Sequence, residues 1–269
     1  MDKLRIASIQ INSEPSQVTK NNEKTVAFLH KAKKEGVQLA VLPELFNVGY
    51  NLPLLKDLDY DCDEAVELYG ELAKSLDMYI AAGLLEVDEK GKYNSVFVFN
   101  NKGEIESKYR KVNLFPLSIE EEIFTAGQKL AVFTVGSFKF GVMICYDIRF
   151  PELGRLYVEK KCNALIVASA FPFPRLDHWR TLLKSRAIEN QLYLIASNRT
   201  GKDKDFWFVG NSCVIDPWGT VKVTMSETDE GIICHDLAIE KVNEVRKFIP
   251  ALKNKQNLDS LISRKILTV

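Results

Sequence analysis

The chain has 269 residues, of which 46% are hydrophobic and 27% are charged, so we expect one globular domain and exclude a disordered or fibrous protein. Lysine plus arginine and aspartate plus glutamate each number 36, so no net charge attracts nucleic acid or an anionic membrane. No secretory leader and no membrane-spanning apolar run is evident, which predicts a cytoplasmic protein that acts on a small molecule.

Apolar patterning predicts an alternation of strands and helices. Residues 4–11 are rich in branched side chains, residues 18–34 repeat apolar positions at helical spacing, and residues 38–42 form the continuous apolar run of a buried strand. The alternation continues with helices predicted at 63–76, 151–160 and 176–190, and strands at 79–86, 95–100, 105–110, 138–144, 164–169, 193–197, 212–215 and 232–235. An α/β domain is expected over residues 1–249, followed at 250–269 by an arm that contacts another subunit or is disordered.

The cysteines and histidines offer no framework for a disulfide or a metal. Five cysteines form an odd set without a CxxC pair, and three histidines are far apart in the sequence. We therefore expect reduced thiols, no metal ion and no cofactor.

Cys145 ends the apolar run 138–144 and is followed by a turn and then by a predicted helix. This order resembles the nucleophile elbow of serine hydrolases, in which backbone N–H groups face a developing oxyanion. A lone cysteine at the end of a buried strand is more often an inert apolar residue, so its position alone does not identify a nucleophile.

Two charged residues at other strand ends complete a set for acyl transfer. Glu44 follows the run 38–42, where a carboxylate is costly unless it is paired or functional, and a partly desolvated glutamate can accept a thiol proton. Lys111 follows the strand 105–110, and its charge can stabilise a thiolate and an oxyanion. A solvated carboxylate and a surface lysine are the alternatives. Ligands in open α/β folds bind beyond such strand ends, which favours the functional interpretation.

The segments around these residues resemble the nitrilase superfamily of carbon–nitrogen hydrolases. LPE contains Glu44, YRKVNLF contains Lys111 and CYDIRFPE begins at Cys145, while residues 187–201 and 210–219 also match in the right order. The resemblance implies a four-layer αββα sandwich and a homodimer or larger homo-oligomer. It also implies a Glu–Lys–Cys set in which the cysteine forms a thioester acyl-enzyme.

The same resemblance implies a second glutamate between the lysine and the cysteine, which helps to position the substrate and the lysine. Spacing back from Gly127 favours Glu120, with Glu121 and Glu122 as alternatives. The chain departs from many relatives at Asn113, where they carry a histidine, but this position is not a catalytic one in the family.

Tyr146 and Asp147 resemble the amidase branches, and residues 178–191 resemble the ω-amidases, which release ammonia from 2-oxo dicarboxylate monoamides. The alternatives are an N-carbamoyl amidase, which would release carbon dioxide and ammonia, and a non-catalytic interaction protein of the same fold. The interaction protein would be expected to have lost a catalytic residue, and none is missing.

A substrate with a distal carboxylate needs a cation in its pocket. Arg149, Arg175 and Arg199 are candidates, although each can equally be a structural ion-pair partner. We expect substrate contacts from four residues of the strand ends, namely Tyr146, Arg149, Phe171 and Phe46. Aromatic residues at such positions are also common in a plain core.

Overall fold

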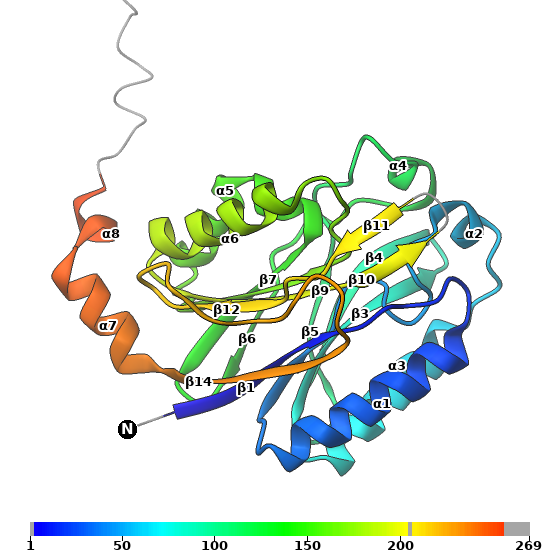
Figure 1. The fold of residues 1–269 in the computed structure, drawn as a ribbon, viewed down its shortest axis with the longest axis horizontal. Coiled ribbons are helices and arrows are strands. Elements are labelled where there is room, and N and C mark those ends of the chain that lie inside the picture. The colour runs from blue at the N-terminus through cyan, green and yellow to red at the C-terminus, as the bar shows by residue number, and fades with distance from the viewer. Residues whose placement is uncertain (1–2, 204–205, 256–269) are drawn as a thin grey trace, which may run out of the picture.

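The computed structural model describes residues 3–203 and 206–255, which fold into four layers (Figure 1). Two six-stranded sheets form the inner layers, and helices cover their outer faces. The αββα sandwich expected from the sequence is therefore confirmed. None of the helices in the described ranges combines the length and the apolar character needed to span a bilayer.

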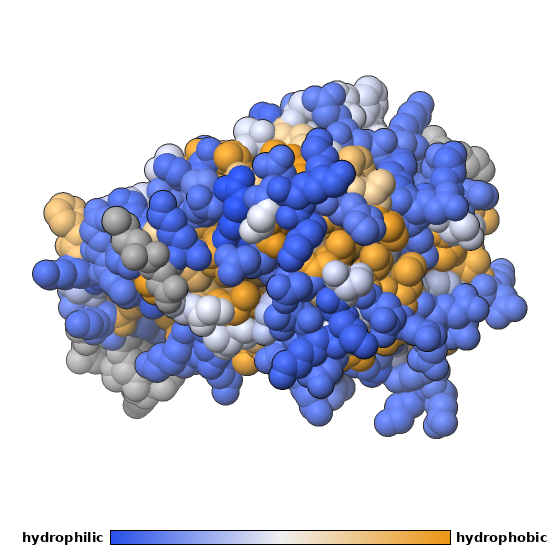
Figure 2. All heavy atoms as spheres, turned by 90° about the horizontal axis from the view of Figure 1, so that it is seen from below, coloured by the Kyte–Doolittle hydropathy of each residue, from blue (hydrophilic) through white to orange (hydrophobic). Residues whose placement is uncertain are grey.

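The first sheet contains the amino-terminal βαβ unit and a strand from near the end of the chain. Its strands, in spatial order, are β14 (Gly231–Ala238), β1 (Lys3–Gln10), β2 (Leu39–Val41), β3 (Tyr79–Asp88), β4 (Gly91–Phe99) and β5 (Ile105–Arg110). Strand β1 pairs in parallel with β2, as the βαβ prediction requires, and antiparallel with β14. Helices α1 (Val18–Lys34) and α3 (Cys62–Ser75) bury their apolar sides on the outer face. Seen from below, where these helices lie, the surface is mostly hydrophilic with smaller apolar areas between polar side chains (Figure 2).

The second sheet is built around three parallel strands. In spatial order its strands are β13 (Val221–Thr224), β12 (Cys213–Ile215), β9 (Tyr193–Asn198), β8 (Ala164–Ser169), β7 (Phe138–Ile144) and β6 (Val132–Val135). Every residue of β8 and β9 is buried, because helices α5 (Pro151–Glu159) and α6 (Leu176–Asn190) cover one face and the first sheet covers the other.

The two sheets are joined by polar bonds as well as by apolar packing. The Ser8 hydroxyl of β1 donates to the Ala196 carbonyl of β9 at 2.8 Å, and the Ser197 hydroxyl donates to the Ile9 carbonyl. These bonds satisfy buried hydroxyl groups at the centre of the sandwich and fix the position of β1 on β9.

Several short elements were not predicted, because segments of three to five residues show too little periodicity. They are α2 (Leu52–Lys56), α4 (Glu120–Ile123), the 3-10 helix η1 (Cys145–Arg149), the hairpin of β10 (Thr200–Asp203) and β11 (Phe206–Val209), and the edge strands β6 and β13. Two helices, α7 (Ile239–Phe248) and α8 (Ala251–Asn254), follow β14. The proposed arm thus begins with α8, and its residues 256–269 lie outside the described residues.

Candidate active site

Glu44, Lys111 and Cys145 each follow a strand, and the fold brings them to one site. Glu44 and Lys111 come after β2 and β5 of the first sheet, whereas Cys145 directly follows β7 of the second sheet. All three residues are buried, and Cys145 is the most exposed at 7%. The site therefore lies across the interface between the two sheets.

The Lys111 ammonium lies between two carboxylates. It donates to Oε1 of Glu44 at 2.8 Å and to Oε1 of Glu120 at 2.7 Å. Of the three consecutive glutamates, only Glu120 is buried, whereas Glu121 and Glu122 are exposed. The geometry thus favours Glu120 as the second glutamate. Within the described part of the chain, no group of three or more His, Cys, Asp or Glu residues is placed to hold a metal ion.

Further donors fix the Glu44 carboxylate. The Asn94 side-chain amide donates to Oε1 at 2.7 Å, and the Ala170 N–H donates to Oε2 at 2.8 Å. Asn94 lies on β4 and Ala170 directly follows β8, so Glu44 is also held from both sheets. Asn94 was not predicted as a site residue, because the predicted strand began one residue after it.

The Glu120 carboxylate is fixed in a similar way. The Tyr50 hydroxyl donates to Oε1 at 2.5 Å, and the Phe115 N–H donates to Oε2 at 2.7 Å. Tyr50 precedes α2 in a segment without periodic patterning, and no feature of the sequence singled it out.

Two glycines let the backbone beside Glu44 and Lys111 approach its neighbours closely. A Cβ atom on Gly83 would lie 2.1 Å from the Pro43 carbonyl oxygen, and one on Gly127 would lie 2.1 Å from the Arg110 carbonyl oxygen. Both distances are far below van der Waals contact, so a side chain at either position would displace a segment of the site.

Cys145 sits on a strained turn. Its φ of 43° lies in the left-handed region, which costs a non-glycine residue about 1 kcal/mol or more. Burial raises the pKa of the thiol, the negative charge of Glu44 raises it further, and Lys111 and the nearby Ser169 hydroxyl lower it by less. The raised pKa favours the protonated thiol at neutral pH, so a nucleophilic role for Cys145 would require a base.

The charges around Glu44 suit it to that task. Burial raises its pKa above the ordinary glutamate value, while Lys111 lowers the pKa and Glu120 raises it. A base with a pKa nearer neutrality transfers protons more effectively in both directions. For Lys111, burial lowers the pKa, but the charges of Glu120 and Glu44 raise it by more, so the ammonium stays charged.

A narrow pocket opens over Cys145, and three of the four residues predicted to contact substrate line it. These are Tyr146, Arg149 and Phe171. The fourth, Phe46, does not line this pocket: its ring is fully buried in the core beneath the helices of the first sheet and packs edge-on against Tyr69 at 5.3 Å. A loop residue next to Glu44 can face either layer, and the sequence does not specify which.

Two of the three candidate arginines, Arg149 and Arg175, also line this pocket. Arg149 lies over Phe171, and Arg175 lies over Phe115. Neither guanidinium forms an ion pair with a carboxylate of residues 3–203 or 206–255. Arg199 does not line the pocket; it is fully buried, and its Nη1 lies 3.7 Å from Oδ2 of Asp203.

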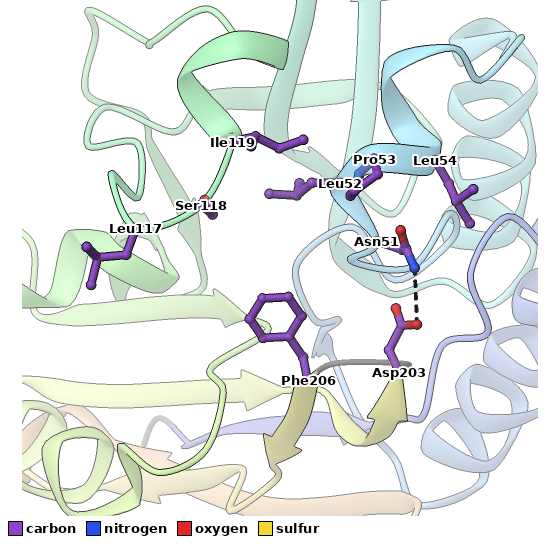
Figure 3. Close-up of a pocket in the computed structure, with 9 residues that line it drawn as sticks. All are labelled: Asn51, Leu52, Pro53, Leu54, Leu117, Ser118, Ile119, Asp203 and Phe206. Atoms are coloured by element: carbon purple, nitrogen blue, oxygen red, sulfur yellow. Dashed lines mark hydrogen bonds between the residues drawn. The ribbon is translucent and has the colours of Figure 1, made fainter.

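A second, wider pocket of about 460 Å³ adjoins the first and shares Ser118 and Phe206 with it (Figure 3). Apolar side chains from α2 and from residues 117–119 form most of its wall. At one end the Asn51 amide donates to Asp203 at 3.2 Å, which links α2 to β10. The Cys145 pocket therefore opens into an apolar cleft.

Comparisons with known proteins agree with this geometry. The carbon-nitrogen hydrolase family model matches residues 5–247. The chain is 37% identical to 2-oxoglutaramate amidase of Bacillus subtilis, over 92% of this chain and 96% of the relative. It is 30% identical to omega-amidase NIT2 of Homo sapiens, over 95% of each chain.

Two solved structures show the same fold. Nit3 of Saccharomyces cerevisiae, a member of branch 10 of the nitrilase superfamily, has a TM-score of 0.86 at 32% identity and covers 95% of this chain and 96% of its own. A carbon-nitrogen hydrolase from Helicobacter pylori has a TM-score of 0.89 at 27% identity, covering 98% and 99%. The resemblance inferred from the sequence is confirmed, and the chain belongs to the carbon-nitrogen hydrolase family.

Proposed function

We propose that the protein is an ω-amidase, which hydrolyses the terminal amide of a 2-oxo dicarboxylate monoamide to a carboxylate and ammonia. The observation that carries this proposal is the pair of guanidinium groups, Arg149 and Arg175, that line the Cys145 pocket without a carboxylate partner among the described residues. A substrate carboxylate would supply that partner through charge-assisted hydrogen bonds. The relatives named 2-oxoglutaramate amidase and omega-amidase support the same substrate class.

In the first half of the proposed reaction, Glu44 accepts the thiol proton while Sγ of Cys145 attacks the amide carbon. The C–S bond forms, and the carbonyl electrons move to oxygen, where the Lys111 ammonium and the Tyr146 N–H stabilise the negative charge. Glu44 then gives its proton to the nitrogen, the C–N bond breaks and ammonia leaves. A thioester on Cys145 remains.

In the second half, Glu44 takes a proton from water, whose oxygen attacks the thioester carbon. The C–S bond breaks, the product leaves as a carboxylic acid, and the sulfur regains its proton from Glu44. Lys111 stays charged throughout because of its two carboxylate neighbours, and Glu120 holds it in place.

Ammonia release from three substrates tests the proposal. We expect kcat/KM to be highest for 2-oxoglutaramate, lower for a neutral amide of similar length, and lowest for an N-carbamoyl amino acid. Preference for the carbamoyl compound, with an amine and carbon dioxide as products, would instead identify an N-carbamoyl amidase. Cys145→Ala should abolish ammonia release, and an acid-trapped acyl adduct should map to Cys145. Parent-like release by this variant would refute the mechanism.

We also propose that the protein acts as a homodimer in the cytoplasm. Large apolar side chains are exposed on three helices: Leu156 on α5 (44%), Ile188 on α6 (53%) and Phe248 on α7 (75%). Exposed apolar residues of this size favour a subunit interface. Sedimentation analysis tests the assembly. Leu156→Asp should shift a dimer toward monomer, and a monomeric parent would contradict the proposed dimer.

The cysteines bear on the proposed location. All five thiols are free, which suits a reducing compartment such as the cytoplasm.

A further inference from the structure

The buried carboxylate of Asp147, two residues after Cys145, accepts four hydrogen bonds. Its Oδ1 accepts the backbone N–H and the side-chain amide of Asn113 at 3.0 and 2.8 Å. Its Oδ2 accepts the Tyr109 hydroxyl at 2.8 Å and the Ile144 N–H at 3.0 Å. Asp147 is fully buried, and it makes no ion pair with any residue in the described ranges. All four donors are therefore neutral groups.

These donors come from both sheets. Tyr109 and Asn113 stand two residues on either side of Lys111, at the end of β5 in the first sheet. Ile144 is the last residue of β7 in the second sheet and directly precedes Cys145. One carboxylate thus fastens the segment that carries the ammonium to the turn that carries the thiol.

A purely local role does not explain this arrangement. Closing the η1 turn requires only the bond from the Ile144 N–H, which is the N-terminal cap of that turn. A carboxylate buried without a cation is costly, and three further bonds reach across to a different sheet. Besides satisfying the buried carboxylate, these three bonds fix where Tyr109 and Asn113 lie relative to Cys145.

We propose that Asp147 is a positioning residue, which sets the place of Lys111 relative to the sulfur of Cys145 by holding Asn113 and Tyr109 of one sheet against the elbow of the other. This inference rests on the proposed roles of Cys145 and Lys111 in acyl transfer. The proposal also gives Asn113 a role at this position, because its side-chain amide and its backbone N–H both donate to Oδ1 of Asp147.

Asp147→Asn tests the proposal with almost no change of shape. An amide has one accepting oxygen and one donating nitrogen, so it cannot accept bonds on both sides. If the amide nitrogen of the new side chain faces Asn113, it meets the two N–H donors of Asn113 and accepts from neither. If it faces Ile144, the backbone N–H before Cys145 loses its acceptor. The first orientation should displace the segment that carries Lys111, and the second should displace the turn that carries Cys145.

Two measurements separate positioning from simple stabilisation. We expect kcat of Asp147→Asn to fall roughly 10- to 100-fold with KM within about twofold, because a small misplacement of reacting groups mainly costs rate. We expect iodoacetamide to alkylate Cys145 roughly 10-fold more slowly at a fixed pH, because a thiolate farther from Lys111 is less stabilised. Peptide mass spectrometry measures the alkylation at Cys145 itself.

Two variants keep the test valid if Asp147→Asn folds poorly. Asn113→Ala removes one of the four bonds without touching the carboxylate and should lower both rates by a smaller factor. The double variant Asn113→Asp with Asp147→Asn exchanges the two side chains, so the amide at position 147 donates to the carboxylate at position 113. This variant should be more active than Asp147→Asn alone. Equal or lower activity of the double variant would contradict positioning.

Glu86→Gln is the control for lost stability, because Glu86 is also a buried carboxylate with several donors, including the cations Lys108 and Arg110, and does not line the Cys145 pocket. It should lower the melting temperature while leaving kcat and alkylation within about twofold. Parent-like kcat and alkylation in both Asp147→Asn and Asn113→Ala would overturn the proposal. A parent that hydrolyses no amide would refute the proposed function instead, whereas alkylation needs no substrate and still tests Asp147.

Discussion

Replacing Lys111 by methionine removes the only ammonium that the Glu44 and Glu120 carboxylates contact among the described residues. Methionine retains an unbranched side chain of similar length, so the change concerns charge more than packing. The two carboxylates would then share a buried site without a counter-ion, and we expect the folded variant to take up one proton.

The distances set the size of the effect. Contacts of 2.8 and 2.7 Å each correspond to roughly 6 kcal/mol of gross attraction at an effective dielectric constant of about 20. Protonation limits the loss. At about pH 7, keeping a proton on a carboxyl of ordinary pKa 4.5 costs about 3.4 kcal/mol, because each pH unit is worth about 1.36 kcal/mol. With one carboxylate still uncompensated, we expect Lys111→Met to lose about 3–5 kcal/mol of unfolding free energy.

The loss should depend on pH with a definite sign. When folding raises the pKa of a carboxyl, the folded protein keeps a proton that the unfolded chain has lost. This has no effect on the unfolding free energy below the unfolded pKa, but the unfolding free energy falls as the pH rises from there through the folded pKa. Glu44 of the parent also has a raised pKa, so parent and Lys111→Met should lose stability in parallel just above pH 4.5. Above the pH at which Glu44 of the parent ionises, the difference in unfolding free energy should grow by about 1.4 kcal/mol per pH unit, until the carboxyl of the variant ionises as well.

Urea unfolding of both proteins across this pH range measures the difference. Lys74→Met is the control, since Lys74 pairs with Glu71 on the surface with 62% of its side chain exposed. This variant should stay within about 0.5 kcal/mol of the parent at every pH. A difference for Lys111→Met that is constant with pH, or below about 1 kcal/mol near neutrality, would refute the reasoning.

Three further predictions concern activity. Glu44→Gln should lower kcat by roughly 10²- to 10⁴-fold with little loss of thermal stability, because Lys111 keeps Glu120 as its counter-ion; parent-like kcat would exclude Glu44 as the base. Because burial raises the pKa of Glu44, the acid limb of the kcat/KM profile should have its midpoint above 4.5, and a midpoint below that value would contradict the assignment. Arg175→Met should raise KM for 2-oxoglutaramate by roughly 10- to 100-fold and leave KM for a neutral amide within about twofold, as steady-state kinetics would show; equal effects on both would argue against a carboxylate site.

Elements with strong apolar patterns could be predicted from the sequence with their observed bounds. Helices α1 and α6 and strands β7 and β8 begin and end where the patterns do. Strand β5 was also predicted with its observed bounds, although only one of its six residues is buried, because turn residues precede it. Edge strand β13 could not be predicted in this way, because none of its four residues is buried and the alternation in VKVT is too short to identify a strand. Helix α7 was also missed, since only Val242 and Val245 of its ten residues are buried.

The same distinction applies to the site. Glu44, Lys111 and Cys145 stand out because each is a charged or nucleophilic residue just after a predicted strand. Asn94 donates to Glu44 and Tyr50 donates to Glu120 through contacts between distant segments, which no local pattern encodes.

Which face a loop side chain takes is also a tertiary property. Only the fold shows that Phe46 lies in the core and not in the Cys145 pocket, and only the fold separates Arg149 and Arg175 from Arg199.

The division of the site between two sheets has a consequence for synthesis of the chain. Glu44 and Lys111 are made before Cys145, and β1 finds its outer partner only when β14, some two hundred residues later, has been made. Until then β1 has no outer partner, and the first sheet, which carries Glu44 and Lys111, has an unpaired edge. We therefore expect a chain that lacks β14 to hold these two residues less firmly against Cys145. Under the proposed mechanism, such an unfinished chain should hydrolyse amides more slowly than the complete one.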